Sequence, residues 1–229
     1  MDPVARATGV LVAFGDRHGG VSRAPYDTLN LAARGGDDPS CVRVNRRRAA
    51  HAAGFDARAL ALARQVHGAE VMEVGAGASG VLGEADGLVA RTPGPVLAML
   101  TADCAPVVVA GADGVALLHA GWRGLVAGVV GRGVARVGVP RAAWIGPAIR
   151  SCCYEVGREV MDAFERAGLP TLGDRVDPAD AARSALTRAG VERVAVADEC
   201  TACSARYFSY RRDGVTGRQG AFAALLPAV

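Results

Sequence analysis

The sequence predicts an α+β fold, a single domain over residues 1–229 in which helices pack outside mixed β-sheets. With 229 residues, 51% of them hydrophobic, the chain can bury one substantial core. Short apolar runs separated by Gly, Asp and Pro have the pattern of buried strands. Several of these runs follow one another before helical spacing begins, which favours mixed sheets over the strand-helix alternation of a Rossmann fold.

In the first half of the chain, the sequence predicts a long loop, then a helix, then a series of strands. The glycine-rich stretch from Gly15 to Pro39 reads as a long loop, which in a compact domain is usually functional. Asp38 can cap a helix that starts at Pro39 and ends at Gly54. The strands expected after it are Ala59–Val66, Glu70–Val74, Gly87–Ala90, Val96–Thr101, Pro106–Ala110 and Val115–His119.

The second half alternates helical and strand patterns. Helices are expected over 121–137, 155–167 and 180–189, where apolar residues recur at helical spacing. Strands are expected at Ala143–Ile145 and Val194–Ala197. A hairpin of Tyr207–Arg211 and Gln219–Leu225, turning at Asp213-Gly214, is expected to close the domain.

Composition and charge exclude several classes of partner. The formal net charge of +3 comes without a block of like charges, and Arg46-Arg47-Arg48 fits a solvated helix face, so no nucleic-acid partner is expected. The longest apolar windows are too short to cross a bilayer, so no membrane partner is expected. The six cysteines follow no secretory signal, which indicates reduced thiols in a cytoplasmic protein.

Three predicted strand ends carry residues that can bind a metal or act as nucleophiles. His67 and His119 each end a strand, and Cys104 follows a third strand in Thr101-Ala102-Asp103-Cys104. Two imidazoles and a thiolate suit Zn²⁺ or copper and leave a coordination position open for substrate. The same residues could form a Cys–His nucleophile pair or lie apart as unconnected buried groups. The residue types alone leave these three interpretations open.

Other candidate sites are weaker. Cys200-Thr201-Ala202-Cys203 is a lone CxxC motif, and the adjacent pair Cys152-Cys153 would be an awkward second half of a metal site, so structural thiols are favoured. His18 and His51 read as surface residues. No glycine-rich stretch has the spacing of an ATP or NAD site.

A set of longer motifs covers nearly the whole chain. They are Gly19-Gly20-Val21-Ser22, Pro25-Tyr26-Asp27-Thr28-Leu29-Asn30-Leu31, Gly36-Asp37-Asp38-Pro39, Asn45-Arg46, Gln65-Val66-His67-Gly68, Ala85-Asp86-Gly87, Thr101-Ala102-Asp103-Cys104, His119-Ala120-Gly121-Trp122-Arg123-Gly124, Ile145-Gly146-Pro147-Ala148-Ile149, Cys153-Tyr154-Glu155-Val156-Gly157, Cys200-Thr201, Phe208-Ser209-Tyr210-Arg211-Arg212-Asp213-Gly214 and Thr216-Gly217-Arg218-Gln219. With these motifs the chain resembles the laccase-domain family, also described as multicopper polyphenol oxidase-like proteins and as purine nucleoside phosphorylases.

The resemblance implies one α+β domain with a mononuclear site for Zn²⁺, with Cu²⁺ as the alternative, made by His67, Cys104 and His119. It implies phosphorolysis of adenosine, inosine or S-methyl-5′-thioadenosine with phosphate, and adenosine deamination as an accompanying activity. Two departures from the family pattern, Ala182 where Asn is usual and Ala32-Ala33-Arg34 where a glycine is common, could change substrate preference.

Roles for further residues follow from their motif context. We expect Cys104, Asp103 and Arg123 to be catalytic residues, with Asp103 orienting a ligand or bound water. Arg46 and Arg123 are the candidates for anion recognition, and Ser22 and Asn30 for the sugar hydroxyls. The alternative functions are a peptidoglycan-precursor editing hydrolase, a copper-dependent polyphenol oxidase, and a non-catalytic metal-binding protein.

Overall fold

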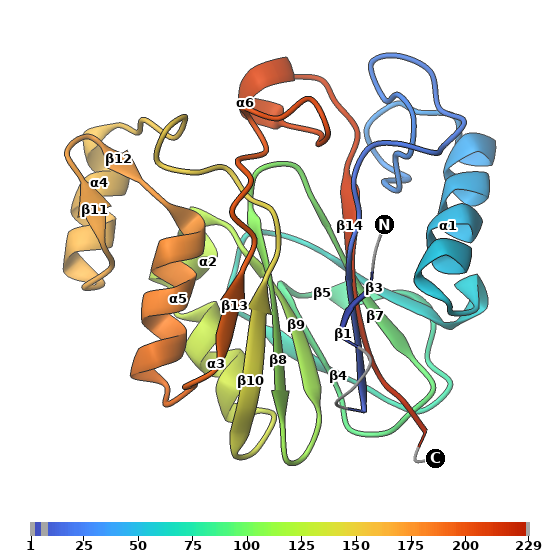
Figure 1. The fold of residues 1–229 in the computed structure, drawn as a ribbon, viewed down its shortest axis with the longest axis horizontal. Helices are drawn as coiled ribbons and strands as arrows, with labels where there is room; N and C mark the ends of the chain where they lie inside the picture. The colour runs from blue at the N-terminus through green and yellow to red at the C-terminus, as the bar shows by residue number, and fades with distance from the viewer. Residues whose placement is uncertain (1–2, 6–8, 228–229) are drawn as a thin grey trace.

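Two six-stranded β-sheets stack face to face, and helices cover their outer faces (Figure 1). The computed structural model describes residues 3–5 and 9–227. The first sheet has the strand order β1 (Pro3–Ala5), β2 (Val10–Phe14), β14 (Gln219–Leu225), β7 (Val96–Thr101), β3 (Leu60–Arg64), β5 (Gly80–Glu84). The second has the order β13 (Val194–Val196), β10 (Pro140–Ile145), β8 (Ala105–Gly111), β9 (Val115–Ala120), β6 (Gly87–Ala90), β4 (Val71–Val74).

Both sheets are mixed, as the sequence predicts. In the first sheet β3 pairs in parallel with β5 and β7, whereas β14 pairs antiparallel with β2 and β7. In the second sheet β4 is parallel to β6 and β10 is parallel to β13, and the other pairings are antiparallel. The α+β fold class is therefore confirmed.

Alternate side chains of one strand pack in different layers of the core. In β7, Leu97 and Met99 pack between the sheets, where they join Leu117 of β9 in one buried cluster. Ala98, between them in sequence, faces outward and joins the cluster that contains Ala49 and other residues of α1 (Pro39–Ala53). This alternation explains how apolar runs without polar gaps can be strands, since both faces of the sheet are buried.

The outer face of the second sheet is covered by helices on the side away from α1 (Figure 1). Leu118 of β9 and Val107 of β8 pack there against side chains from those helices. The helices are α2 (Trp122–Val126), α3 (Val129–Ala135) and α5 (Pro178–Arg188), and the peripheral elements α4 (Arg158–Arg166), β11 (Thr171–Leu172) and β12 (Arg175–Val176) extend beyond them. Within residues 3–5 and 9–227, no helix has both the length and the apolar character needed to span a bilayer.

Most predicted elements are found, with shifted ends. The helix from Pro39 to Ala53 is confirmed, with the Asp38 carboxylate accepting from the N–H of Ser40 and Gly54 ending the helix in the left-handed region. The helix predicted over 121–137 is two helices, because Gly128 at φ 83° separates α2 from α3. Short elements such as η1 (Ala57–Ala59), β2 and β5 were not predicted.

The predicted hairpin is wrong. Its first arm is irregular and ends in the short helix α6 (Tyr210–Asp213), whose start is capped by the Ser209 hydroxyl accepting from the N–H of Arg212. Its second arm, β14, is a strand, but it pairs with β2 and β7 instead of with residues 207–211. The Asp213-Gly214 signal therefore marks the end of a helix.

Candidate functional site

His67, Cys104 and His119 meet where strand ends of the two sheets converge. His67 follows β3 of the first sheet, whereas Cys104 precedes β8 and His119 lies near the end of β9 in the second sheet. The register of β8 and β9 pairs Ala105 with Ala120, which places Cys104 beside the end of β9. The potential ligand atoms of the three residues lie within 4.8 Å of one another. The two imidazole rings meet edge to face at 72°, with centroids 4.8 Å apart.

The backbone around this cluster is held in unusual conformations. His67 and Asp103 have φ values of 60° and 95°, a region that disfavours residues with a Cβ atom and is often found at functional sites. Gly121 leaves room for the cluster, because a Cβ atom there would lie 3.0 Å from His67 Cδ2 and 3.1 Å from Cys104 Sγ. A side chain at Gly121 would therefore occupy the space between the potential ligands.

Asp86 positions two of the three residues. Its fully buried carboxylate accepts from His119 Nδ1 at 2.8 Å and from the backbone N–H of His67 at 3.0 Å. The N–H groups of Val66 and Gly68 donate to its other oxygen. Because Nδ1–H of His119 is engaged by a carboxylate, Nε2 is left with its lone pair for a metal, which is the usual arrangement around histidine ligands.

The cluster also changes the protonation of its members in the metal-free protein. Burial would raise the pKa of the Cys104 thiol, but the positive charge and hydrogen bonds of His119 and His67 lower it to about 6. Burial would lower the pKa of His119, but the Cys104 thiolate and Asp86 raise it to about 9. Cys104 and His119 therefore form a thiolate–imidazolium pair near neutral pH.

The donor set fits a soft or borderline divalent metal. One thiolate sulfur and two imidazole nitrogens are ligands of zinc and copper, and three protein ligands leave a position open to the cavity beside them. Among the described residues the only other close group of potential ligands is Cys152, Cys153, Cys200 and Cys203, so His18 and His51 belong to neither group.

A cavity of about 730 Å³ opens onto the three residues. This volume is within the range of small-molecule sites. Its wall combines aromatic and cationic side chains: Trp122, Tyr154, Tyr210, Arg34, Arg46, Arg64, Arg123, Arg211 and Arg218. Such a wall suits a ligand that has a flat ring and an anionic group.

Two of these arginines are held in place and partly removed from solvent. Arg46 Nε donates to the carbonyl of Leu31 at 3.0 Å, and Arg218 Nη1 donates to the carbonyls of Thr216 and Gly217, each at 2.8 Å. Burial lowers the pKa of both guanidinium groups below the ordinary value of arginine. Arg123 is more exposed and stacks over the Trp122 ring at 4.2 Å.

Ser22 and Asn30 lie behind the cavity wall. Both are buried, and neither is among the residues that line the cavity. The Ser22 hydroxyl and the Asn30 amide each donate to one oxygen of Asp37, at 2.7 and 2.8 Å. Asn30 Oδ1 also accepts from the backbone N–H of Arg218. These contacts connect the 15–39 loop to the segment that carries Arg218, and a contact of either residue with a sugar hydroxyl stays a prediction.

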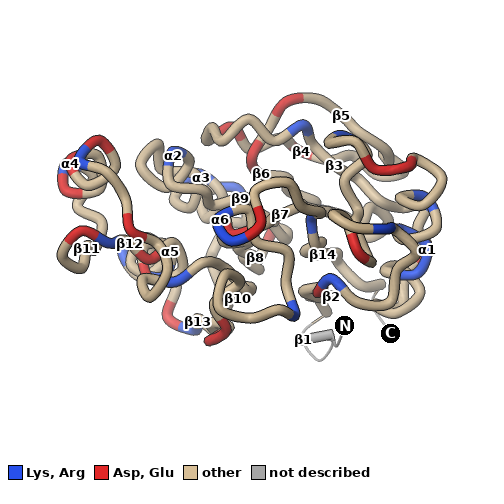
Figure 2. The backbone as a smooth tube through the Cα atoms, turned by 90° about the horizontal axis from the view of Figure 1, so that it is seen from above, with Lys and Arg blue, Asp and Glu red and all other residues tan. Residues whose placement is uncertain are grey.

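Asp103 ties the site to α6. One of its carboxylate oxygens accepts from the Thr201 hydroxyl and the other from the backbone N–H of Arg211, both at 2.7 Å. Seen from above, α6 lies over the middle of the molecule with basic and acidic residues side by side (Figure 2). Asp103 therefore helps to hold the helix that carries Tyr210 and Arg211 over the cavity.

Several residues of this site have no individual role that the sequence predicts. Tyr154, Tyr210, Arg211 and Arg218 belong to the motifs of the resemblance but carry no separate signal in sequence. Asp86 was also only part of a motif, although an acid directly before the predicted strand Gly87–Ala90 is a detectable signal. Arg46 and Arg123 were expected from their motifs and do line the cavity, whereas Arg211 and Arg218 have no local signal, because only the tertiary fold brings their segments to it.

Comparison with known proteins identifies similar chains. The family described as multi-copper polyphenol oxidoreductase laccase matches residues 11–226. The purine nucleoside phosphorylase YfiH of Escherichia coli (strain K12) is 40% identical over 228 residues, covering 93% of each chain. A purine nucleoside phosphorylase of Deinococcus radiodurans is 41% identical over 236 residues, covering 96% of this chain and 91% of that protein.

Solved structures have the same fold. YlmD from Geobacillus stearothermophilus superposes with a TM-score of 0.87 at 35% identity, covering 96% of this chain and 93% of that chain. The Neisseria meningitidis protein NMB0706 superposes with a TM-score of 0.85 at 34% identity, covering 99% of this chain and 98% of that chain.

Proposed function

Because the chain belongs to the multi-copper polyphenol oxidoreductase laccase family, and its similar relatives are named purine nucleoside phosphorylases, we propose that it is a purine nucleoside phosphorylase. The proposed substrates are phosphate and adenosine, inosine or S-methyl-5′-thioadenosine. The observation that carries the proposal is the cavity itself, in which arginines and aromatic rings surround an opening onto His67, Cys104 and His119.

The reaction needs groups that the cavity supplies. A phosphate oxygen bonds to the anomeric carbon of the sugar, the glycosidic C–N bond breaks, and its electron pair passes to the purine nitrogen, which takes up a proton. We assign phosphate binding to Arg46, Arg123 and Arg218, whose guanidinium groups can offer paired N–H donors to an anion. Tyr154 and Trp122 are assigned to the faces of the purine ring.

His67, Cys104 and His119 are the proposed ligands of one metal ion, zinc in preference to copper. When bound there, the metal would supply a Lewis acid facing the substrate. Asp86 holds His119 through Nδ1, and Asp103 positions α6. Ser22 and Asn30 are proposed to fix the wall that carries Arg218, besides the sugar contacts expected from their motifs. The six free thiols fit a reducing compartment such as the cytoplasm.

Oxidation of phenols is a poorer fit to these residues. Four-electron reduction of oxygen by copper oxidases uses a cluster of copper ions rich in histidine ligands. The described part of the chain gathers two of its four histidines at one site and leaves His18 and His51 outside any such group. The peptidoglycan-editing alternative would instead use Cys104 as the nucleophile on an amide carbon.

The test is to incubate the purified, metal-analysed protein with adenosine, inosine and S-methyl-5′-thioadenosine, with and without phosphate. We expect free base and sugar 1-phosphate only when phosphate is present. Arg218→Ala should raise the KM for phosphate more than it lowers kcat. Ammonia and inosine formed from adenosine would add the deaminase activity. Absence of base release from all three nucleosides would disprove the proposal.

Matched variants distinguish loss of the proposed site from a general effect on the folded protein. His67→Ala should abolish base release, whereas His51→Ala, on the exposed side of α1, should retain it. If a folded Cys104→Ala variant still catalyses phosphorolysis, then Cys104 is not required for the reaction. Loss of activity in that variant with an unchanged circular dichroism spectrum argues against a non-catalytic metal-binding protein.

A further inference from the structure

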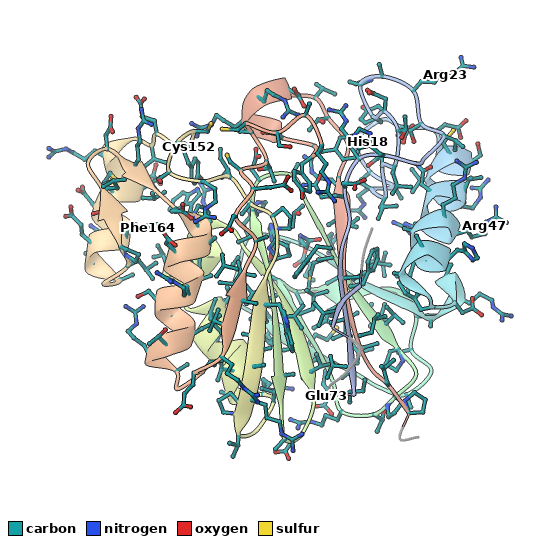
Figure 3. All side chains as sticks on the ribbon, in the orientation of Figure 1. His18, Arg23, Arg47, Glu73, Cys152 and Phe164 are labelled. Atoms are coloured by element: carbon teal, nitrogen blue, oxygen red, sulfur yellow. The ribbon has the colours of Figure 1, made fainter. Side chains whose placement is uncertain are left out.

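A second group of thiols lies apart from the His67, Cys104 and His119 cluster. It consists of Cys152, Cys153, Cys200 and Cys203, called here the four-cysteine cluster, and all four sulfur atoms lie within 4.8 Å of one another. Cys203 Sγ is 3.5 Å from Cys152 Sγ and 3.2 Å from Cys153 Sγ. Figure 3 shows Cys152 in a loop between the α4 and α5 side of the molecule and α6, which Figure 1 labels in the same orientation.

The cluster joins two loops whose contacting cysteines are 50 and 51 residues apart in sequence. Ala148 forms a parallel bridge with Cys200, and the N–H of Thr201 donates to the Ala148 carbonyl at 3.0 Å. These contacts continue the parallel pairing of β10 with β13 beyond the ends of both strands. Turns then close each loop, since the N–H of Cys153 donates to the carbonyl of Arg150 and that of Ser204 to the carbonyl of Cys200. Each loop thereby brings two thiols to the same point.

The sulfur positions fit coordination of one ion better than a disulfide. In a tetrahedral site with Zn–S bonds of about 2.3 Å, the sulfur atoms lie about 3.8 Å apart. Two of the observed distances, 3.5 and 3.2 Å, are slightly shorter than this, and all four sulfur atoms lie within 4.8 Å of one another. A disulfide would require about 2.05 Å, and all four cysteines are free thiols. The backbone N–H of Arg150 donates to Cys200 Sγ at 3.4 Å, a contact that stabilises a thiolate.

Cationic side chains surround the loops. Arg175 Nη1 donates to the carbonyl of Cys152 at 3.0 Å, and Arg212 Nη1 donates to the carbonyl of Thr201 at 3.0 Å. Four thiolates around a divalent ion retain a net negative charge, and these guanidinium groups offset it. The adjacent pair Cys152-Cys153 looked awkward for a metal site in sequence, but its turn directs both thiols toward Cys203.

We propose that the four-cysteine cluster is a second metal site, which binds one zinc ion through four thiolates. Binding releases the thiol protons to solvent and involves no oxidation or reduction. Four protein ligands fill the tetrahedral coordination of zinc, so this site is structural and leaves no position for substrate. The proposal does not depend on phosphorolysis, because it concerns a different set of residues.

The position of the cluster gives the ion a defined effect on the cavity. Thr201, next to Cys200, donates to Asp103, which also holds the N–H of Arg211. Tyr154, next to Cys153, lines the cavity. Zinc would fix both loops to each other and so stabilise the wall that carries Tyr154, Asp103 and Arg211.

Cobalt binding to the full-length chain tests the proposal. The double variant His67→Ala/Cys104→Ser removes two ligands of the first cluster, so cobalt bound by it reports on the four-cysteine cluster. We expect one Co²⁺ per chain, with the intense visible bands and near-ultraviolet charge-transfer band of tetrahedral thiolate-rich cobalt. Added Zn²⁺ should remove these bands.

A matched pair of cysteine variants in the same background identifies the ligands. Cys203→Ser, at an exposed position, should weaken cobalt binding by at least about tenfold and reduce the charge-transfer band, because one thiolate is lost. Cys41→Ser, in α1, should change neither. Circular dichroism confirms that each variant is folded.

Three results would overturn the assignment. They are failure of the double variant to bind cobalt, equal binding by Cys203→Ser and its parent, and a Cys152–Cys203 or Cys153–Cys203 disulfide in protein purified anaerobically. Absence of phosphorolysis by the unaltered chain, together with cobalt binding by the double variant, would count against the proposed function and leave the second metal site standing.

Discussion

Cys104 lies between two imidazoles, and this arrangement determines its reactivity. Burial opposes ionisation of the thiol, but His119 and His67 outweigh it and bring the pKa to about 6 in the metal-free protein. A thiol with a lowered pKa stays a thiolate, and therefore reactive, to lower pH than an ordinary cysteine at about 8.5.

Alkylation of metal-free protein by iodoacetamide, followed by mass spectrometry of the Cys104 peptide, measures this pKa. The rate should fall as the pH drops through about 6, because protonation removes the nucleophile. His119→Ala should raise the midpoint, since burial remains while the positive charge is lost. His18→Ala, in the 15–39 loop, serves as the control, and an unchanged midpoint in His119→Ala would contradict the assigned cause.

Asp86 is expected to act through His119 and His67 without touching the metal. Asp86→Asn should weaken zinc binding by about 10- to 100-fold, because the carboxylate that orients His119 is replaced by an amide. Competition with a chromophoric chelator gives the affinity. Glu84→Gln, an exposed neighbour in β5, should leave it unchanged. Equal affinities in the two variants would show that Asp86 serves the fold alone.

The sequence predicts the potential ligands better than it predicts the residues around them. His67, Cys104 and His119 stand out because polar groups interrupt apolar strands at their ends. Arg218 and Arg211 have no such contrast, because they lie among other polar residues and reach the cavity only through the tertiary fold. The two cysteine pairs were considered as one metal site and disfavoured, because the sequence does not show that their loops meet beyond the β10–β13 pairing.

At the scale of elements, Gly128 decides that one predicted helix is two. Its φ of 83° lies in the left-handed region, and a Cβ atom there would meet nothing within 4 Å. Gly128→Ala should therefore destabilise the protein by about 1–2 kcal/mol through backbone strain alone. Gly131→Ala, at an exposed helical position of α3, should instead stabilise it by about 0.5–1 kcal/mol. Urea unfolding measures both, and destabilisation of equal size in the two variants would contradict this reading.

The failed hairpin prediction shows the limit of local turn signals. Asp213-Gly214 has the composition of a tight hairpin turn, and Gly214 does have a positive φ of 65°. The same composition also ends a helix, and the Ser209 cap with its hydrogen bond to Arg212 favours that outcome. Strand periodicity located β14 correctly but did not indicate its partners, because pairing between distant strands leaves no local pattern.

At the scale of the whole molecule, the two sheets are held together by their shared apolar core. Leu117 of β9 is fully buried in the cluster between them. Leu117→Ala should cost about 2–5 kcal/mol of unfolding free energy, since it leaves a cavity between the sheets. Leu172→Ala, at an exposed position of β11, should cost far less. Urea titration compares them, and similar losses would place the main stabilising contacts elsewhere.

The sequence predicts the α+β fold class, but it does not predict that two sheets pack face to face. Uninterrupted apolar strands indicate burial on both faces, but a helix and a second sheet can each provide that burial. In β7, Leu97 faces the second sheet and Ala98 faces α1, so alternate residues of one strand are buried by a sheet and by a helix. The sequence does not show which alternate position faces which layer.

The place of β14 has a consequence for the order of events during synthesis. Residues 219–225 follow every other described strand in the chain, yet they lie between β2 and β7 inside the first sheet. Domains fold as their chains leave the ribosome, at about 5–20 residues per second. The segment from β3 to β9 can already have emerged with His67, Cys104 and His119, while the gap between β2 and β7 waits for the last strand. A nascent chain stalled before residue 219 would therefore present two open strand edges to chaperones and to other chains.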